Sequence, residues 1–195
     1  MDQLETVFVN SPLRRLMQKY LEFRMLGKFL ESHHINLRGK ALLDAGCGSG
    51  YGLKLIHDTF NPQELRGFDI LAGEVALARK RGISATITRD SIVATRFPPE
   101  TFDAVFEFTI LHHVPQWRDA MKEVARILKP QGVFLLSDLN KFSTDFFAFT
   151  TRVHHPPDAQ FQWPDFIRGL QEAGFAILQQ RILLRQLGLF LCQKR

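Results

Sequence analysis

The stretch LLDAGCGSGYG, residues 42–52, decides the fold of this 195-residue chain. Its first residues continue a short apolar run of the kind that forms a buried strand, and glycines then occupy positions 46, 48 and 50. Glycine adopts backbone angles closed to other residues and lets a ligand approach the main chain. From Tyr51 onward the apolar spacing becomes helical. The stretch therefore predicts a strand, a tight turn and a helix whose N-terminal amides suit an anionic group.

Further strands and helices are predicted on both sides of this turn. The expected strands are 40–45, 65–70, 84–89, 102–108 and 133–137, followed in the tail by 175–184 and 187–192. The expected helices are 12–31, 51–58, 75–80 and 120–128, with a short one after Pro164 that ends at Gly174. The first five strands alternate with helices, which predicts a doubly wound α/β parallel sheet. The last two are joined by only Arg185 and Gln186, so they form an antiparallel hairpin.

The composition is that of a soluble domain. Hydrophobic residues make up 45% of the chain and charged residues 23%, and no apolar run approaches the roughly 18 residues of a membrane-spanning helix. The N-terminal residues lack the order of a signal peptide, in which basic residues precede an apolar run. The two cysteines provide no disulfide framework. We expect one cytoplasmic domain over residues 1–195, without stable membrane insertion.

The spacing of the glycines narrows the choice of ligand. A dinucleotide fingerprint, G-x-G-x-x-G, needs its third glycine at position 51 or 53, where tyrosine and leucine stand. The pattern G-x-G-x-G with Asp44 before it is instead similar to that of class I S-adenosylmethionine-dependent methyltransferases, the small-molecule and quinone-biosynthesis type included. FDAVFEFTILHHV, residues 102–114, and LKPQGV, residues 128–133, resemble two further segments of that family in the same order. The resemblance spans about residues 40–138.

The resemblance implies a seven-stranded sheet of order 3-2-1-4-5-7-6 and S-adenosyl-L-methionine as cofactor. Asp69, at the end of the second strand, would accept the ribose hydroxyls, and Asp90 after the third would accept from the adenine amine. Both aspartates are also in place to cap the following helices, which is a common use of this residue. Cys47 is best explained as a small filler of the turn. The full set expected at the cofactor is Asp44, Gly46, Cys47, Gly48, Gly50, Asp69, Ile70, Asp90, Ser91 and Thr109.

Histidines are the candidates for a general base. Methyl transfer from a sulfonium is an in-line displacement, and a base is needed only where the acceptor must lose a proton. Six of the seven histidines form adjacent pairs, whose side chains diverge, so no metal site is expected. His112 and His113 follow the fourth strand, and His155 lies before the last helix. These three are candidate catalytic residues, although packing and orienting the loop explains the first pair as well.

Phenylalanine occurs 18 times and gathers around the expected acceptor site. We expect residues 1–39 to form a helical lid, residues 40–195 the cofactor-binding core, and about 139–162 a substrate-lining insertion. The apolar residues assigned to this lid are Phe8, Leu13, Leu16, Phe23, Leu26 and Phe29 in the first segment, and Phe142, Phe146, Phe147, Phe149 and Phe161 in the second. A small apolar or aromatic acceptor would suit them, whereas core packing accounts for several.

The same sequence features bear on other possible functions and partners. A dehydrogenase conflicts with the glycine spacing, and a DNA amino-methyltransferase conflicts with the sequence TILH at 109–112, where a Pro-Pro motif would stand. A non-catalytic S-adenosylmethionine-binding module, or a methyltransferase acting on RNA or protein, stays open. The net charge of +5 is mild. Its cations on the first helix (Arg14, Arg15, Lys19, Arg24 and Lys28) suit a solvated surface, an acidic partner or a membrane face alike.

Overall fold

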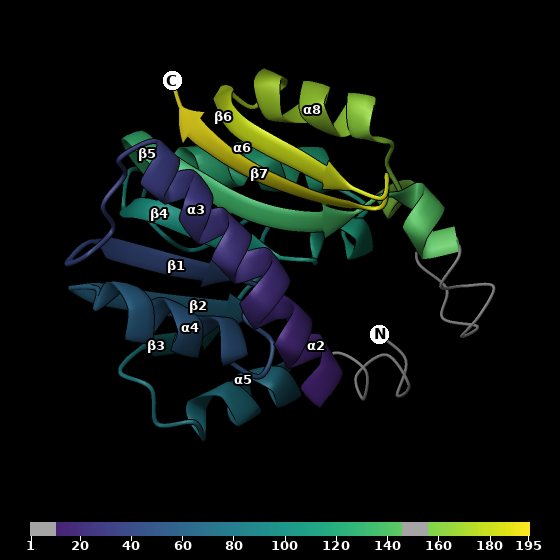
Figure 1. Cartoon of the computed structure of the whole chain (residues 1–195). Coiled ribbons are helices and arrows are strands. Elements are labelled where there is room, and N and C mark those ends of the chain that lie inside the picture. The colour runs from purple at the N-terminus through teal and green to yellow at the C-terminus, as the bar shows by residue number, and fades with distance from the viewer. Residues whose placement is uncertain (1–10, 146–155) are drawn as a thin grey trace.

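A seven-stranded sheet of order β3-β2-β1-β4-β5-β7-β6 forms the centre of the molecule (Figure 1). The computed structural model describes residues 11–145 and 156–195. Strands β1 to β5 run parallel, and β7 and β6 close the sheet antiparallel, so the predicted class and strand order are confirmed. The strands are β1 (Ala41–Ala45), β2 (Glu64–Asp69), β3 (Thr86–Arg89), β4 (Phe102–Phe108), β5 (Leu128–Leu139), β6 (Phe175–Leu183) and β7 (Leu187–Lys194).

The register of the parallel strands brings their carboxyl ends to one edge. Ala45 at the end of β1 is paired with Phe68 of β2 and with Glu107 of β4. Residues that follow these strands therefore emerge side by side, which is where open α/β sheets bind ligands.

Helices cover both faces of the sheet, and each face has its own buried cluster. One cluster lies beneath α6 and α8, and the other beneath α3, α4 and α5 (Figure 1). The bounds are α2 (Pro12–Met17), α3 (Arg24–Ser32), α4 (Tyr51–Phe60), α5 (Ala72–Arg79), α6 (Trp117–Ile127) and α8 (Trp163–Glu172). Short 3-10 turns are η2 (Leu111–His113) and η3 (Pro157–Ala159). Within the described ranges, none of the helices combines the length and apolarity that crossing a bilayer requires.

The first helix departs from the regular helix predicted over residues 12–31. It starts as expected, with the Ser11 hydroxyl accepting from the Arg14 amide at 3.1 Å. Between α2 and α3, however, Gln18–Phe23 form a π-helix, η1. The wider π-turn changes which side chains share a face. The sequence gives no local signal for it, since no proline or glycine lies within it.

Several strand boundaries also differ from the predictions, by up to five residues at the start of β5. β5 runs from Leu128 to Leu139 and exceeds 133–137 at both ends, because Leu128 pairs with Phe102 of β4 and β7 pairs with β5 as far as Leu139. The hairpin turn takes in Leu184, which was expected in the strand, and Leu184 and Arg185 both have positive φ.

Candidate active site

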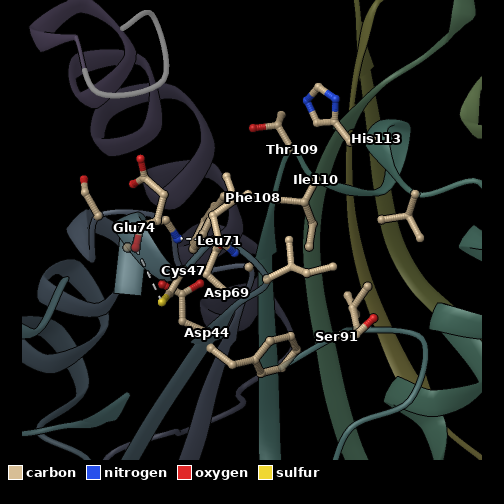
Figure 2. A pocket seen from close by; sticks show the side chains of 18 of the residues that line it. Asp44, Cys47, Asp69, Leu71, Glu74, Ser91, Phe108, Thr109, Ile110 and His113 are labelled. Atoms are coloured by element: carbon tan, nitrogen blue, oxygen red, sulfur yellow. Dashed lines mark hydrogen bonds between the residues drawn. The ribbon is translucent and has the colours of Figure 1, made fainter. Parts of the chain in front are cut away.

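A cavity of about 450 Å³ opens at the carboxyl ends of β1, β2 and β4. Its size falls in the range of small-molecule sites. Figure 2 shows Asp44, Cys47 and Asp69 across the pocket from Thr109 and His113. The wall includes most of the residues predicted at the cofactor: Asp44, Gly46, Cys47, Gly48, Asp69, Ile70, Asp90, Ser91 and Thr109.

The glycine turn between β1 and α4 has the strained backbone that its sequence predicts. Gly46 has φ +72°, and a Cβ there would stand 2.5 Å from the Ile110 side chain. The Gly48 amide donates to the Asp69 carboxylate at 2.9 Å. Gly50 caps α4 with φ +83° and packs against Ala78. It is absent from the cavity wall, and its contact with the cofactor stays a prediction.

Asp44 lies at the end of β1 and is buried in the cavity wall. Within the described part of the chain, neither of its carboxylate oxygens accepts a hydrogen bond. Burial, together with repulsion from the nearby Asp69, raises the pKa of this carboxyl from 3.8 to about 8. A buried carboxyl with two unused acceptor atoms is costly in isolation. A cation placed in the cavity would remove that cost.

Asp69 holds the turn between β2 and α5. Its two oxygens accept from the amides of Gly48 and Leu71, both at 2.9 Å. Burial raises its pKa, and those amides oppose the shift. The contact with the Leu71 amide closes the turn before α5, a helix whose N-cap residue, Leu71, makes no side-chain cap hydrogen bond. The contact with Gly48 ties β2 to the glycine turn. Each oxygen keeps a lone pair, so the predicted ribose contact stays a prediction compatible with this geometry.

Asp90 and Ser91 follow β3 at the far end of the cavity. The Asp90 carboxylate accepts from the Ser91 amide at 2.9 Å and from the Arg96 amide at 3.2 Å. Ile92 and Val93 continue the wall with apolar side chains, and Ile70 also lines it. Asp90 thus shapes its loop, and its contact with adenine stays a prediction.

Cys47 is buried in the turn, and its thiol lies 3.7 Å from the Gly48 carbonyl. Burial, with the nearby Asp44 and Asp69 carboxyls, raises the pKa of this thiol far above its ordinary value. The thiolate is therefore suppressed, which argues against a nucleophile.

Thr109, directly after β4, is held in a strained conformation at the cavity. It has φ +60°, which a β-branched residue rarely adopts. Its amide donates to the Ser137 carbonyl at 2.7 Å, and its hydroxyl accepts from the Arg14 guanidinium. Arg14 is in turn paired with Glu22 at 2.6 Å, and Glu22 accepts from the Ser137 hydroxyl at 2.7 Å. Such strain often marks a functional site.

The predicted histidines separate into two environments. His113 lines the cavity, whereas His112 is buried with its Nδ1 atom 2.5 Å from the Asp138 carboxylate. The two rings lie 3.9 Å apart between centroids. Glu107 is also buried here, and burial, with repulsion from Asp138, raises its pKa. His155 lies outside the described residues.

The cavity wall also contains residues that the sequence analysis missed. Arg14, Arg15 and Gln18 reach it from the first helix, whereas the sequence left Arg14 and Arg15 open to a solvated surface, an acidic partner or a membrane face. Glu74 is buried in the first turn of α5 and also lines the cavity. An acid just after the second strand was a usable signal for Glu74, but the predicted helix, 75–80, began three residues later than α5 and left Glu74 out.

The residues of the expected apolar lid lie in different environments in the structure. Phe161 belongs to the core, where it packs against Trp117 and Phe166. Leu26 and Phe29 are buried against the sheet, and Phe23 packs on Phe106 and Phe108. Leu13, Leu16 and Phe142 are exposed. Phe8, Phe146, Phe147 and Phe149 lie outside the described residues.

The donor set fits S-adenosylmethionine. The unpartnered oxygens of Asp44 suit an ammonium group, the glycine turn leaves the backbone accessible, and the apolar Ile70, Ile92 and Val93 of the wall suit a flat base. Residues 43–136 match the family described as "Methyltransferase domain". That match, the fold and this pocket together support a class I S-adenosylmethionine-dependent methyltransferase domain.

Known relatives agree in class and differ in length. A fatty-acid O-methyltransferase of Mycolicibacterium smegmatis is 27% identical over 150 residues, which cover 76% of this chain and 48% of the relative. A phthiotriol/phenolphthiotriol dimycocerosates methyltransferase of Mycobacterium tuberculosis is 31% identical over 109 residues, covering 54% of this chain and 40% of the relative. The chain therefore spans less than half the length of these two relatives.

Solved structures show the same fold at low sequence identity. A SAM-dependent methyltransferase from Aquifex aeolicus superposes with a TM-score of 0.77 over 100% of both chains at 17% identity. A methyltransferase from Mesorhizobium loti reaches the same TM-score at 17% identity, over 91% of this chain and 100% of its own.

Proposed function

We propose that this chain transfers a methyl group from S-adenosylmethionine to a small apolar acceptor bound in the same cavity. The observation that carries the proposal is Asp44, a buried carboxyl without a hydrogen-bond partner among the described residues, beside a glycine turn in the cavity wall. The bound cofactor supplies a methyl group already activated by its sulfonium. The protein has to position the acceptor and exclude water.

On the cofactor side, each residue has a distinct proposed task. Asp44 receives the ammonium of the methionine part, and Gly46 and Gly48 let that part approach the main chain. Asp69 accepts the ribose hydroxyls while its bonds to Gly48 and Leu71 hold it in place. Asp90 and Ser91 border the base. These tasks follow the charges and donors that each group presents to the cavity.

On the acceptor side, Thr109 and His113 border the cavity with the apolar Ile110 and Val114. His113 is the general base for a hydroxyl acceptor, since its ring faces the cavity and imidazole titrates near neutrality. A carboxylate acceptor needs no base. His112, held by Asp138, orients the loop and is a positioning residue. The names of the two mycobacterial relatives support an apolar, lipid-like acceptor.

Substrate choice is proposed to lie in the two segments outside the core, residues 1–39 and about 139–162. Arg14, Arg15 and Gln18 of the first segment and Pro156 of the second all line the cavity. Arg14 pairs with Glu22, and Glu22 accepts from Ser137 of β5, and these contacts support the proposed role of the first segment as a lid over the site.

Isothermal titration calorimetry tests the cofactor site. S-adenosylhomocysteine should bind and NAD should not. Asp69→Ala should weaken binding by at least about ten-fold, the equivalent of about 1.4 kcal/mol. Asp119→Ala is the matched control, since this aspartate is exposed on α6, away from the cavity wall. Equal affinities of the Asp69→Ala and parent proteins would rule out the ribose assignment.

A transfer assay with labelled cofactor tests the reaction. Fatty acids and long-chain phenols present a carboxylate and a hydroxyl acceptor on similar apolar bodies. His113→Asn should lower kcat for the phenol by about 10²–10⁴-fold and leave the fatty acid nearly unchanged. Cofactor binding with transfer to neither class, nor to RNA or protein, would favour a non-catalytic binding module.

A further inference from the structure

The N-terminal part of the first helix, residues 12–22, is amphipathic in the inverse sense for a surface helix, whereas α3 buries its apolar side in the usual way. Its charged side chains Arg14 and Glu22 turn inward and are only 12% and 2% exposed. Large apolar residues face outward at helical spacing: Leu13 is 59% exposed, Leu16 55%, Met17 40% and Tyr20 54%. A helix on a globular protein ordinarily buries the apolar side. This outward stripe, Leu13, Leu16, Met17 and Tyr20, is hereafter called the apolar stripe.

Cations border the apolar stripe. Lys19, Arg24 and Lys28 are exposed on the same helix, and the Lys19 ammonium lies 5.0 Å from the Tyr20 ring centroid. Between residues 12 and 30 the only acidic side chain is Glu22, which is buried and paired with Arg14. The outward surface of this segment is therefore apolar and positive, without a carboxylate. That combination complements the acyl boundary and headgroups of an anionic bilayer.

The apolar stripe is adjacent to the site. Arg14, Arg15 and Gln18 alternate with its residues in sequence and line the cavity from the other side of the helix. Phe142 and Leu184 are exposed at the same edge of the sheet. Phe142 follows the end of β5, and Leu184 lies in the turn before β7, whose first residue, Leu187, pairs with Leu139 of β5. An apolar acceptor leaving a bilayer beneath the helix would have a short path to the cavity.

We propose that the apolar stripe and Lys19, Arg24 and Lys28 dock this chain on an anionic membrane surface, from which it takes its acceptor. The docking deepens the proposed function, since it rests on an apolar acceptor. The interaction itself is peripheral: the stripe enters the interface and the cations meet lipid phosphates. It should weaken with salt, because exposed charges are screened.

Vesicle flotation tests this docking independently of methyl transfer. The full chain is mixed with phosphatidylcholine vesicles, with or without phosphatidylglycerol, at low and high salt. We expect retention on the anionic vesicles only. Leu16→Ser/Met17→Ser should lower the partition coefficient by at least about ten-fold. Lys19→Gln/Arg24→Gln/Lys28→Gln should lower it by about five-fold per cation removed.

Controls keep the result specific. Ile182→Ser on β6 and Lys122→Gln on α6 change exposed residues of the same chemistry away from the first helix, and both should leave retention unchanged. Every variant is also titrated with S-adenosylhomocysteine, so loss of vesicle binding with intact cofactor binding excludes misfolding. Vesicle binding without methyl transfer would count against the proposed acceptor and leave the docking supported.

Two outcomes would overturn the docking. One is retention on anionic vesicles that neither multiple variant reduces. The other is a parent protein that does not bind vesicles but forms a concentration-dependent dimer, as measured by light scattering. In that case Leu16→Ser/Met17→Ser would dissociate the dimer. The second result would make another copy of the chain the occupant of the stripe.

Discussion

Arg14 and Glu22 form a buried, two-pronged ion pair, with Nη1–Oε1 and Nη2–Oε2 distances of 2.6 and 3.2 Å, across the π-helical turn η1. Two turns of a regular α-helix separate residues about seven apart. These residues are eight apart, and the additional residue is accommodated by the wider π-turn. The pair also joins the helix to the sheet through Thr109 and Ser137. It therefore fixes the helix over the cavity with its polar side inward.

Breaking this pair from one side should destabilise the fold strongly. Arg14→Gln leaves a buried carboxylate without its cation, which costs about 3–5 kcal/mol in the free energy of unfolding. Arg14→Gln/Glu22→Gln should recover at least about 1 kcal/mol relative to the sum of the single changes. Urea denaturation of the parent and three variants measures this coupling. Additivity of the two changes within about 0.5 kcal/mol would contradict it.

The apo protein should become less stable as pH rises from about 4 to 8. The pKa of Asp44 is about 8 in the folded chain against 3.8 ordinarily, so in this window the folded state holds a proton that the unfolded state has released. The stabilisation is complete below pH 4 and lost as pH passes 8. One such group contributes a slope of up to about 1.4 kcal/mol per pH unit.

Asp44→Asn should remove that part of the slope. Asp69 and Glu107 also have raised pKa values, so a smaller decline of the same sign should remain. Urea midpoints at a series of pH values, without cofactor, give both slopes. Identical slopes for the parent and the variant would mean that Asp44 is ionised in the folded protein.

Gly52→Ala should weaken cofactor binding by about ten-fold. A Cβ at this position would stand 2.5 Å from the Asp44 carboxylate and 3.1 Å from the Gln18 amide nitrogen, and would push both from their places in the cavity wall. Gly73→Ala on α5 is the matched control, since nothing lies within 4 Å of its added Cβ. Calorimetry with S-adenosylhomocysteine compares them. Similar affinities would show that Asp44 adjusts without loss.

Gly188→Ala should destabilise the closing hairpin by about 1–3 kcal/mol. Its Cβ would meet the Trp163 ring at 2.5 Å and the Phe190 ring at 2.7 Å, both of them buried. Gly27→Ala in α3 has open space around the new Cβ and should stabilise by about 0.5–1 kcal/mol. Thermal unfolding of both proteins tests the contrast. Equal midpoints would mean that α8 moves away from β7 at little cost.

Much of the fold follows from local sequence patterns. The strand before Gly46, the turn and the start of α4 are set by glycines and by an apolar run, which act within a few residues. The alternation of strands and helices predicts the parallel sheet, and a short connection forces the final hairpin. Asp44, Asp69 and Asp90 lie at strand ends, so the sequence alone places them at one edge.

The first helix shows a property that local sequence patterns do not predict, namely which of its sides is buried. Leu13, Leu16, Met17 and Tyr20 recur at helical spacing and predict the helix correctly, yet in the structure this apolar side faces solvent. Its opposite side packs inward because Arg14 forms an ion pair with Glu22 and donates a hydrogen bond to Thr109. Glu22 in turn accepts a hydrogen bond from Ser137. The spacing of apolar residues predicts that the two sides of the helix differ in polarity, but it does not predict which side packs against the sheet.

The sequence by itself determined the class of fold, the glycine turn and the carboxylates that border it, because backbone conformation and strand polarity are local properties. Only the tertiary structure decided that Arg14, Arg15, Gln18 and Glu74 line the cavity, that His113 faces it while His112 turns to Asp138, and that the apolar side of the first helix is exposed. Those outcomes depend on contacts between residues up to 115 positions apart, as for Glu22 and Ser137. Such contacts contribute to stability only when folding has brought the two partners together, so a local sequence pattern does not reveal them.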